Sequence, residues 1–294
     1  MPPAPADARP TWPWPPAGSW RPAAAWQPVG PWRIRGAWRP ARRWRAAARP
    51  AWRPSRPVVP RLVVPAYFHP AVAPEDWARL ARQADQIRLV ILNPASGPGQ
   101  EPDAVFLNAL RPLRDAGVQV AAYVDTNYGQ RPWREALDEI ARYLDWYQVD
   151  GVLFDRVSAG LADLRHYALL SRRARKMGAG VVVFNHGVHP HEAYARHADV
   201  LGTFEGPWNV YLEEAVPRWT RSWPADRFYH VVYSVPVEHL GDAVLMAGRR
   251  RAGCIYVTDH GGGNPYNRLP ALVPAPTATR WPAPPGSAAR WTGE

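Results

Sequence analysis

Two carboxylates in this sequence stand where a catalytic pair is expected. Asp155 ends the apolar run of residues 151–154, and Glu205 ends a second apolar run, residues 200–204. A buried strand that ends on an acid and continues through a loop into a helix presents catalytic groups in many α/β enzymes. Two carboxylates are also the minimum for glycoside hydrolysis, in which one protonates the leaving oxygen and the other attacks or activates water. The alternative for each acid is an ion pair with a nearby arginine or a cap on a helix.

The elements that must position these acids alternate between strand-like and helix-like runs along residues 61–274. Apolar runs rich in β-formers predict strands at residues 62–67, 88–93, 118–124, 151–155, 180–184, 200–204, 228–235 and 254–258. Amphipathic runs predict a helix from Pro74 onward and helices at residues 104–116, 131–146, 161–177, 191–196, 210–219 and 236–250. Eight such β-then-α units predict an α/β fold, a single (β/α)8 TIM-type barrel, because eight strands close without leaving an edge.

In a barrel of this kind the chemistry lies at the C-terminal ends of the strands. Every predicted strand end carries polar or aromatic side chains, which suit a carbohydrate whose hydroxyls form hydrogen bonds and whose ring faces stack on aromatic rings. The candidate substrate-binding residues are Tyr67, His69, Asn93, Asp125, Tyr128, Arg156, Asn185, Trp208, Tyr233 and Asp259. Two alternatives stay open, since Trp208 could instead pack in the core and Asp125 could cap its own loop.

Other chemistries find less support in the sequence. His186, His189 and His191 cluster after the fifth predicted strand and His260 follows the eighth, but their spacing fits no standard zinc pattern. We therefore predict no metal and no cofactor. The absence of a Gly-x-Ser-x-Gly motif disfavours a Ser-His-Asp hydrolase. A single cysteine, Cys254, excludes an intrachain disulfide and a multi-cysteine metal site.

The positive charge of the chain is concentrated in its first sixty residues. The net charge is +11, but residues 1–60 hold eleven Arg and one acid, which leaves 25 basic and 24 acidic residues for the remainder. The same segment holds fifteen Pro and a Trp at every sixth position from Trp14 to Trp44. We predict a disordered Pro/Trp/Arg-rich tail at residues 1–60 and a second loose end at residues 275–294.

Two interpretations of the N-terminal tail stay open: contact with anionic polymers through charge and stacking, and a low-complexity extension with no binding role. Because the remainder of the chain is close to neutral, we predict no specific binding to nucleic acid. No stretch approaches 18 uninterrupted apolar residues, so no transmembrane helix is expected. The N-terminal residues also lack the apolar core of a signal peptide.

Several motifs of the predicted barrel occur together in a familiar order. They are Val64-Pro65-Ala66-Tyr67, Asn93-Pro94-Ala95-Ser96-Gly97-Pro98-Gly99, Tyr123-Val124-Asp125-Thr126-Asn127-Tyr128-Gly129, Asp150-Gly151-Val152-Leu153-Phe154-Asp155, Thr203-Phe204-Glu205, Tyr256-Val257-Thr258-Asp259 and Asn264-Pro265-Tyr266. Over about residues 62–272 the chain thereby resembles the spherulin-4 (spherulation-specific family 4) proteins. The resemblance implies a (β/α)8 barrel related to endo-acting glycosidases that cleave α-1,4-linked galactosamine or N-acetylgalactosamine polymers of microbial exopolysaccharide. It also implies an extracellular location.

The resemblance implies roles for the two acids, and the sequence departs from the pattern of the related hydrolases at one position. In the hydrolases of this type the fourth strand ends in an adjacent Asp-Glu pair and a later Glu closes the sixth strand, which match Asp155 and Glu205. Arg156 stands where the second acid of the pair would be. An arginine beside Asp155 is expected to hold it ionised, as nucleophile or stabiliser, with Glu205 as acid/base. Two hypotheses stay open: a polysaccharide-cleaving hydrolase, and a non-catalytic or differently specific glycan-binding barrel.

Overall fold

The computed structural model describes residues 58–270 of the chain. The predicted C-terminal segment and all but residues 58–60 of the predicted N-terminal tail lie outside the described residues. The same holds for residues 271–274 of the predicted barrel.

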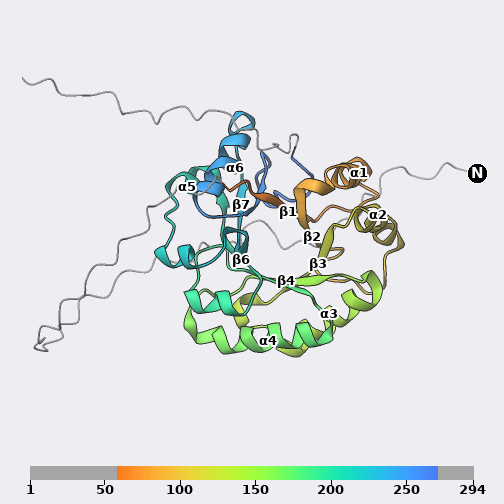
Figure 1. Cartoon of the computed structure of the whole chain (residues 1–294). Coiled ribbons are helices and arrows are strands. Elements are labelled where there is room, and N and C mark those ends of the chain that lie inside the picture. Colours follow the sequence, from red (N-terminus) through yellow and green to blue (C-terminus); the bar gives the residue numbers. More distant parts are fainter. Residues whose placement is uncertain (1–57, 271–294) are drawn as a thin grey trace, which may run out of the picture. The chain divides into compact units, whose positions relative to one another are not determined.

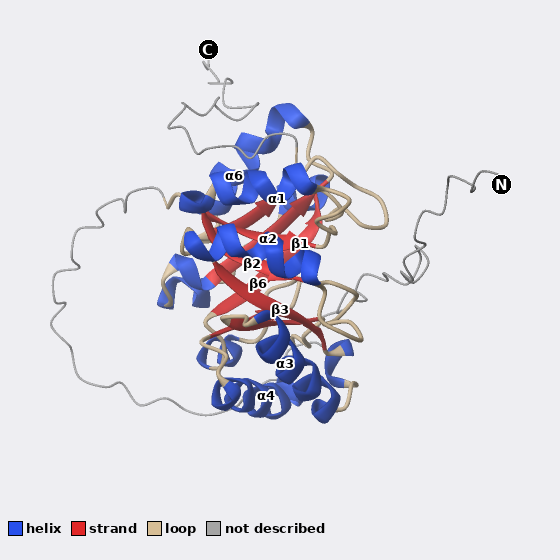
Figure 2. Cartoon of the chain, turned by 90° about the vertical axis from the view of Figure 1, so that its right-hand side faces the viewer, coloured by secondary structure: helices blue, strands red, loops and turns tan. Residues whose placement is uncertain are grey.

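Eight parallel strands close into a barrel in the order in which they occur along the chain, and helices surround them (Figure 1). The strands are β1 (Arg61–Ala66), β2 (Ile87–Leu92), β3 (Gln119–Asp125), β4 (Gly151–Asp155), β5 (Val181–Asn185), β6 (Val200–Pro207), β7 (Phe228–Tyr233) and β8 (Cys254–Val257). Figure 2 shows the strands as the inner layer of the fold. The predicted (β/α)8 TIM-type barrel is confirmed.

The helical layer agrees with the predicted helices in most places. Its members are α1 (Pro74–Arg82), α2 (Ala104–Asp115), α3 (Trp133–Tyr147), α4 (Leu164–Met177), α5 (Trp208–Glu213) and α6 (Leu240–Arg249). The strands are apolar on both faces because one face packs in the barrel interior and the other against these helices. Every residue of β4, for example, is buried. Within the part of the chain that the structure describes, no helix is long and apolar enough to cross a membrane.

Two of the predicted helices are wrong in type or extent. The expected helix at residues 210–219 is divided: α5 ends at Glu213 and a separate 3₁₀ turn spans Arg218–Ser222. Pro217 precedes that turn, and a proline disfavours helical backbone in the residue before it. Residues 191–196 contain a 3₁₀ helix, Glu192–Arg196, instead of an α-helix. A segment of five residues is too short for several α-helical hydrogen bonds to form.

Strand β6 carries an irregularity next to one of the candidate acids. Its register with β7 shifts between Gly202 and Phe204, so that Thr203 is the extra residue of a bulge. Bulges bend a strand and redirect the side chains that follow, and they are frequent beside active sites. Glu205 lies two residues after this bulge.

Candidate active site

The side-chain amide of Asn185 joins the two candidate acids. Its Nδ2 donates hydrogen bonds to Asp155 Oδ1 at 2.8 Å and to Glu205 Oε2 at 2.7 Å. Because both oxygens bind the same nitrogen, they lie no more than 5.5 Å apart. The three residues belong to the consecutive strands β4, β5 and β6, and so the barrel order itself brings them together.

A glycine on β6 leaves the space that the bridging amide needs. Gly202 is the register partner of Asn185, and a Cβ at this glycine would lie 2.3 Å from Asn185 Oδ1. Any larger side chain would therefore displace the amide that holds the two carboxylates.

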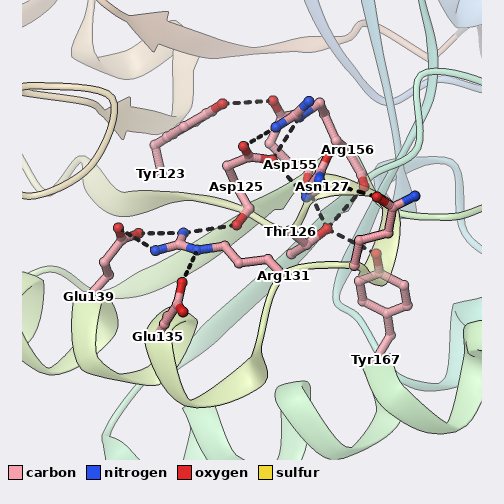
Figure 3. Close-up of polar contacts among 11 residues, drawn as sticks. Tyr123, Asp125, Thr126, Asn127, Arg131, Glu135, Glu139, Asp155, Arg156 and Tyr167 are labelled. Carbon is pink, nitrogen blue, oxygen red and sulfur yellow. Dashed lines mark hydrogen bonds and ion pairs between the residues drawn. The ribbon is translucent and has the colours of Figure 1, made fainter.

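Two tyrosines complete the hydrogen bonds of the acids. Tyr123 donates its hydroxyl to Asp155 Oδ2 at 3.0 Å, as Figure 3 shows, and Tyr266 donates to Glu205 Oε1 at 2.6 Å. The ring of Tyr67 lies edge-on to both, with centroids 5.3 Å from Tyr123 and 5.6 Å from Tyr266. Burial, followed by the negative charge of the nearest acid, raises the pKa of Tyr67 and Tyr266 well above the ordinary value, which keeps both phenols protonated.

The surroundings of Asp155 alter its protonation. Asp155 is only 8% exposed, and this burial raises its pKa to about 6, with the negative charge of Glu205 as the second cause. Hydrogen bonds from Asn185, from the backbone N–H of Arg156 and from Tyr123 oppose the rise. Asp155 is therefore an acid that changes its protonation state close to neutral pH.

Arg156 does not pair with Asp155. Its Nε donates to Asp125 Oδ1 at 2.7 Å and its Nη2 binds the other oxygen of the same carboxylate (Figure 3). The backbone of Arg156 is left-handed, with φ of 51°, and its side chain binds the carboxylate at the end of the neighbouring strand β3. The prediction that Arg156 holds Asp155 ionised is wrong, since the pKa of Asp155 is raised.

A network of hydrogen bonds fixes the loops that follow β3 and β4 (Figure 3). Thr126 Oγ1 lies 2.8 Å from the carbonyl oxygen of Asp155 and 2.9 Å from that of Arg156. On the other side of Asp125, Arg131 donates to its backbone carbonyl at 3.0 Å and forms an ion pair with Glu139 at 2.7 Å. These contacts connect the end of β3, the end of β4 and helix α3.

Three further predicted residues lie close to the acids. Tyr67 contacts the tyrosines described above. Burial, followed by the negative charge of Asp155, raises the pKa of Tyr128, and the charge of Glu205 adds to the rise. Tyr233 is partly buried, and its pKa is raised by burial and then by the charge of Glu205. With Asn185, these residues provide aromatic and amide groups around the pair, which is the composition expected for a carbohydrate site.

Other predicted residues have structural partners. His69 Nε2 lies 2.9 Å from Asp103, the residue that caps α2. Asn93 accepts a hydrogen bond from the Gly97 backbone inside its own loop at 2.9 Å. The ring of Trp208 stacks on His239 at 5.8 Å, and Asp259 lies beside His260 at 3.9 Å.

The three histidines that follow β5 each contact a different partner. His186 Nδ1 lies 3.0 Å from the carbonyl oxygen of Ser158, His189 Nδ1 lies 2.9 Å from Glu214, and His191 accepts from the Ala193 backbone. Burial lowers the pKa of His186 to about 3, so this ring stays neutral. Among residues 58–270, no group of three or more His, Cys, Asp or Glu side chains is placed to hold a metal ion.

Two tyrosines of the site, Tyr123 and Tyr266, were not among the predicted residues. Tyr123 stands two positions before Asp125, and the alternation of side chains along a strand could have placed it on the same face. Tyr266 comes nine residues after the end of β8, and strand periodicity carries no information about such a distant loop residue.

Comparison with known proteins agrees with this barrel. The model of spherulation-specific family 4 matches residues 61–278. The chain belongs to this family. Spherulin-4 of Physarum polycephalum is 26% identical over 226 residues, which cover 72% of this chain and 68% of that protein. The crystal structure of Aspergillus clavatus Sph3 in complex with GalNAc is similar with a TM-score of 0.60 and 26% identity, covering 71% of this chain and 94% of that one. Together they indicate a glycoside-hydrolase-like fold.

Proposed function

We propose that this protein hydrolyses a glycosidic bond of an α-1,4-linked polysaccharide built from galactosamine or N-acetylgalactosamine. The observation that carries the proposal is the pair Asp155 and Glu205, whose carboxylate oxygens lie within 5.5 Å of each other on one amide. Carboxyl groups about 5–5.5 Å apart are typical of retaining glycosidases, whereas inverting enzymes separate them by about 6.5–9.5 Å to admit a water. The relation to Sph3, solved with GalNAc, supports the sugar class.

The surroundings of the two acids support different roles. Asp155 accepts hydrogen bonds from Asn185, Tyr123 and a backbone N–H, which stabilise a carboxylate once the pH exceeds its pKa of about 6. We assign it as nucleophile or stabiliser of the positive charge that develops on the sugar. Glu205 is less buried and can exchange a proton with solvent and leaving oxygen, as an acid/base must. These three donors offset only part of the rise in the pKa of Asp155 that burial and the charge of Glu205 cause.

The second candidate function is a barrel that binds glycan without cleaving it. The observation that favours it is Arg156 at the position of the second acid of the related hydrolases. If that acid is required for proton transfer, the remaining pair binds sugar and performs no hydrolysis.

One experiment separates the two functions. The protein is incubated with partially N-acetylated α-1,4-galactosaminan and new reducing ends are measured for wild type, Asp155→Asn, Glu205→Gln and Glu101→Gln. Glu101 is an exposed carboxylate and serves as the matched control. We expect reducing ends from wild type and Glu101→Gln alone, with retained anomeric configuration by NMR. Equal signal from all four proteins would refute the assignment, and polysaccharide affinity without reducing ends would identify the binding barrel.

A further inference from the structure

The chain that follows β8 provides one of the hydrogen bonds of the acid pair. Residues 258–270 form no helix or strand, and Tyr266 in this segment donates its hydroxyl to Glu205 Oε1 at 2.6 Å. Tyr266 is only 9% exposed, and its ring lies edge-on to that of Tyr256 with centroids 5.9 Å apart. The other side-chain donors to the pair belong to strands β3 and β5, whereas Tyr266 needs other contacts to fix its position.

An aspartate of helix α1 holds this segment two positions beyond Tyr266. Asp76 Oδ2 accepts hydrogen bonds from Arg268 Nε at 2.9 Å and from the Leu269 backbone N–H at 3.3 Å. The carboxylate is nearly completely buried, since only 4% of the Asp76 side chain is exposed. A buried carboxylate requires donors in place of the water that it has lost, so these two bonds hold the segment at one position.

Two further residues hold the same end of the segment. Arg79, one helical turn after Asp76, donates to Asp76 Oδ1 at 3.3 Å and to the Pro270 carbonyl at 2.7 Å. Tyr256 of β8 donates its hydroxyl to the Arg268 carbonyl at 3.3 Å. Helix α1 and strand β8 therefore both bind the backbone that follows Tyr266.

These contacts lie where the barrel closes, which is an alternative reason for their presence. Strands β1 and β8 share only two register pairs, and α1 is the first helix after β1. A carboxylate that only joined the ends of the barrel would contribute to stability and leave the acid pair unaffected. The path to the pair is short, however, because Arg268 and Tyr266 are separated by at most about 7 Å of extended chain. A shift of the backbone at Arg268 therefore moves the phenol.

We propose that Asp76 is a positioning residue for the acid pair: through residues 266–270 it holds the Tyr266 hydroxyl on Glu205. The inference rests on the proposed function for the role of Glu205 as acid/base. A hydrogen bond weakens steeply once its distance and angle leave the favoured range, so a small displacement of Tyr266 is enough to lose it. A hydrogen bond donated to a carboxylate favours the ionised form, and its loss changes the pH dependence of catalysis.

Carboxyl ¹³C NMR of the full chain tests this role without turnover. The Glu205 resonance is identified by its absence in Glu205→Gln. Its position at neutral pH is compared among wild type, Tyr266→Phe, Asp76→Ala and the double variant. We expect Asp76→Ala to shift the resonance in the same direction as Tyr266→Phe, and the double variant to shift it no further than Tyr266→Phe, because both substitutions remove the same hydrogen bond.

Two more variants separate positioning from stability. Arg268→Ala removes one of the bonds to Asp76 from a side chain that is 60% exposed, and it should cause a smaller shift in the same direction even if Asp76→Ala does not fold. Asp150→Ala is the matched control, because that carboxylate also accepts a backbone N–H, from Val120 at 2.8 Å, but at the N-terminal ends of β3 and β4. It should lower the melting temperature and leave the Glu205 resonance unchanged.

Reducing-end assays on the galactosaminan add a kinetic measurement. We expect kcat of Asp76→Ala to fall roughly tenfold, with a pH profile that moves in the same direction as that of Tyr266→Phe. Asp150→Ala should keep the wild-type profile.

The proposal would be overturned if Tyr266→Phe left the Glu205 resonance unchanged, if Asp76→Ala and Arg268→Ala both did so, or if the single shifts added in the double variant. A wild-type protein that releases no reducing ends but shows the shared shift would contradict the proposed hydrolysis and leave the positioning role standing. Release by the wild type, with no shift in the Asp76 and Arg268 variants, would do the reverse.

Discussion

Replacing Asp155 with asparagine should stabilise the fold while it removes activity. The pKa of Asp155 rises from 3.8 to about 6 because the carboxylate is buried beside the charge of Glu205. At 1.36 kcal/mol for each pKa unit, the ionised carboxylate lowers the free energy of unfolding by about 3 kcal/mol. An asparagine of the same shape carries no such charge and can still accept from Asn185, and the net pKa shift already includes the stronger hydrogen bonds that the ionised carboxylate accepts.

The direction of the pH dependence follows from proton binding. Between about pH 4 and pH 6 the folded protein keeps a proton on Asp155 that the unfolded chain releases, so the stability of the wild type falls as the pH rises through this range. Above about pH 6 the free energy of unfolding of the wild type has fallen by the full amount, and at pH 4 it has fallen very little. The advantage of Asp155→Asn should therefore be about 1–3 kcal/mol at pH 7.5 and close to zero at pH 4.

Urea unfolding at the two pH values measures this difference. Asp138→Asn, an exposed aspartate on α3, is the matched control and should show no gain at either pH. Glu205→Gln should lower the pKa of Asp155 in a ¹³C NMR titration, but only in part, because burial is the larger cause. Equal destabilisation by Asp155→Asn at both pH values would contradict this prediction. It would mean that the hydrogen bonds to the carboxylate stabilise the fold more than the burial of its charge destabilises it.

Two further substitutions test the groups that hold the pair. Tyr266→Phe removes the 2.6 Å hydrogen bond to Glu205, and kcat/KM should fall roughly 10- to 100-fold with a shifted pH profile; an unchanged profile would assign Tyr266 a packing role. Gly202→Ala places a Cβ 2.3 Å from Asn185 Oδ1 and should abolish reducing-end formation, whereas Gly160→Ala, whose Cβ meets nothing within 4 Å, should retain it. Full activity of Gly202→Ala would show that the amide bridge is dispensable.

The barrel was predictable because its strands are short apolar runs with clear ends. The predicted strand at residues 151–155 coincides with β4, where Gly151 begins the strand and a charged residue ends it. A Cβ at Gly151 would lie 2.2 Å from the Val181 carbonyl oxygen, so this glycine also permits close strand packing. The division of the helix near Pro217 was missed because apolar periodicity continued through the segment, although proline is a known helix terminator.

The site residues that could be predicted are those whose proximity follows from the order of the strands. Asp155 and Asn185 end successive strands and Glu205 lies near the end of the next one, and a closed barrel brings such residues together. The partner of Arg156 was out of reach, because it depends on a single left-handed φ that no periodicity encodes. With a right-handed or extended backbone at Arg156, its side chain would leave the backbone in another direction and would not reach Asp125 in the same way.

The departure at Arg156 does not disturb the hydrogen bonds that hold the acid pair. The pair Asp155 and Glu205 takes its hydrogen bonds from Asn185, Tyr123 and Tyr266, and none of these contacts passes through the arginine side chain. What the side chain changes is the charge beside Asp125, which an acid would make doubly negative and the arginine makes neutral. The exchange of an acid for Arg156 thus changes the charge at the end of β3 and leaves the side-chain hydrogen bonds of the two carboxylates in place.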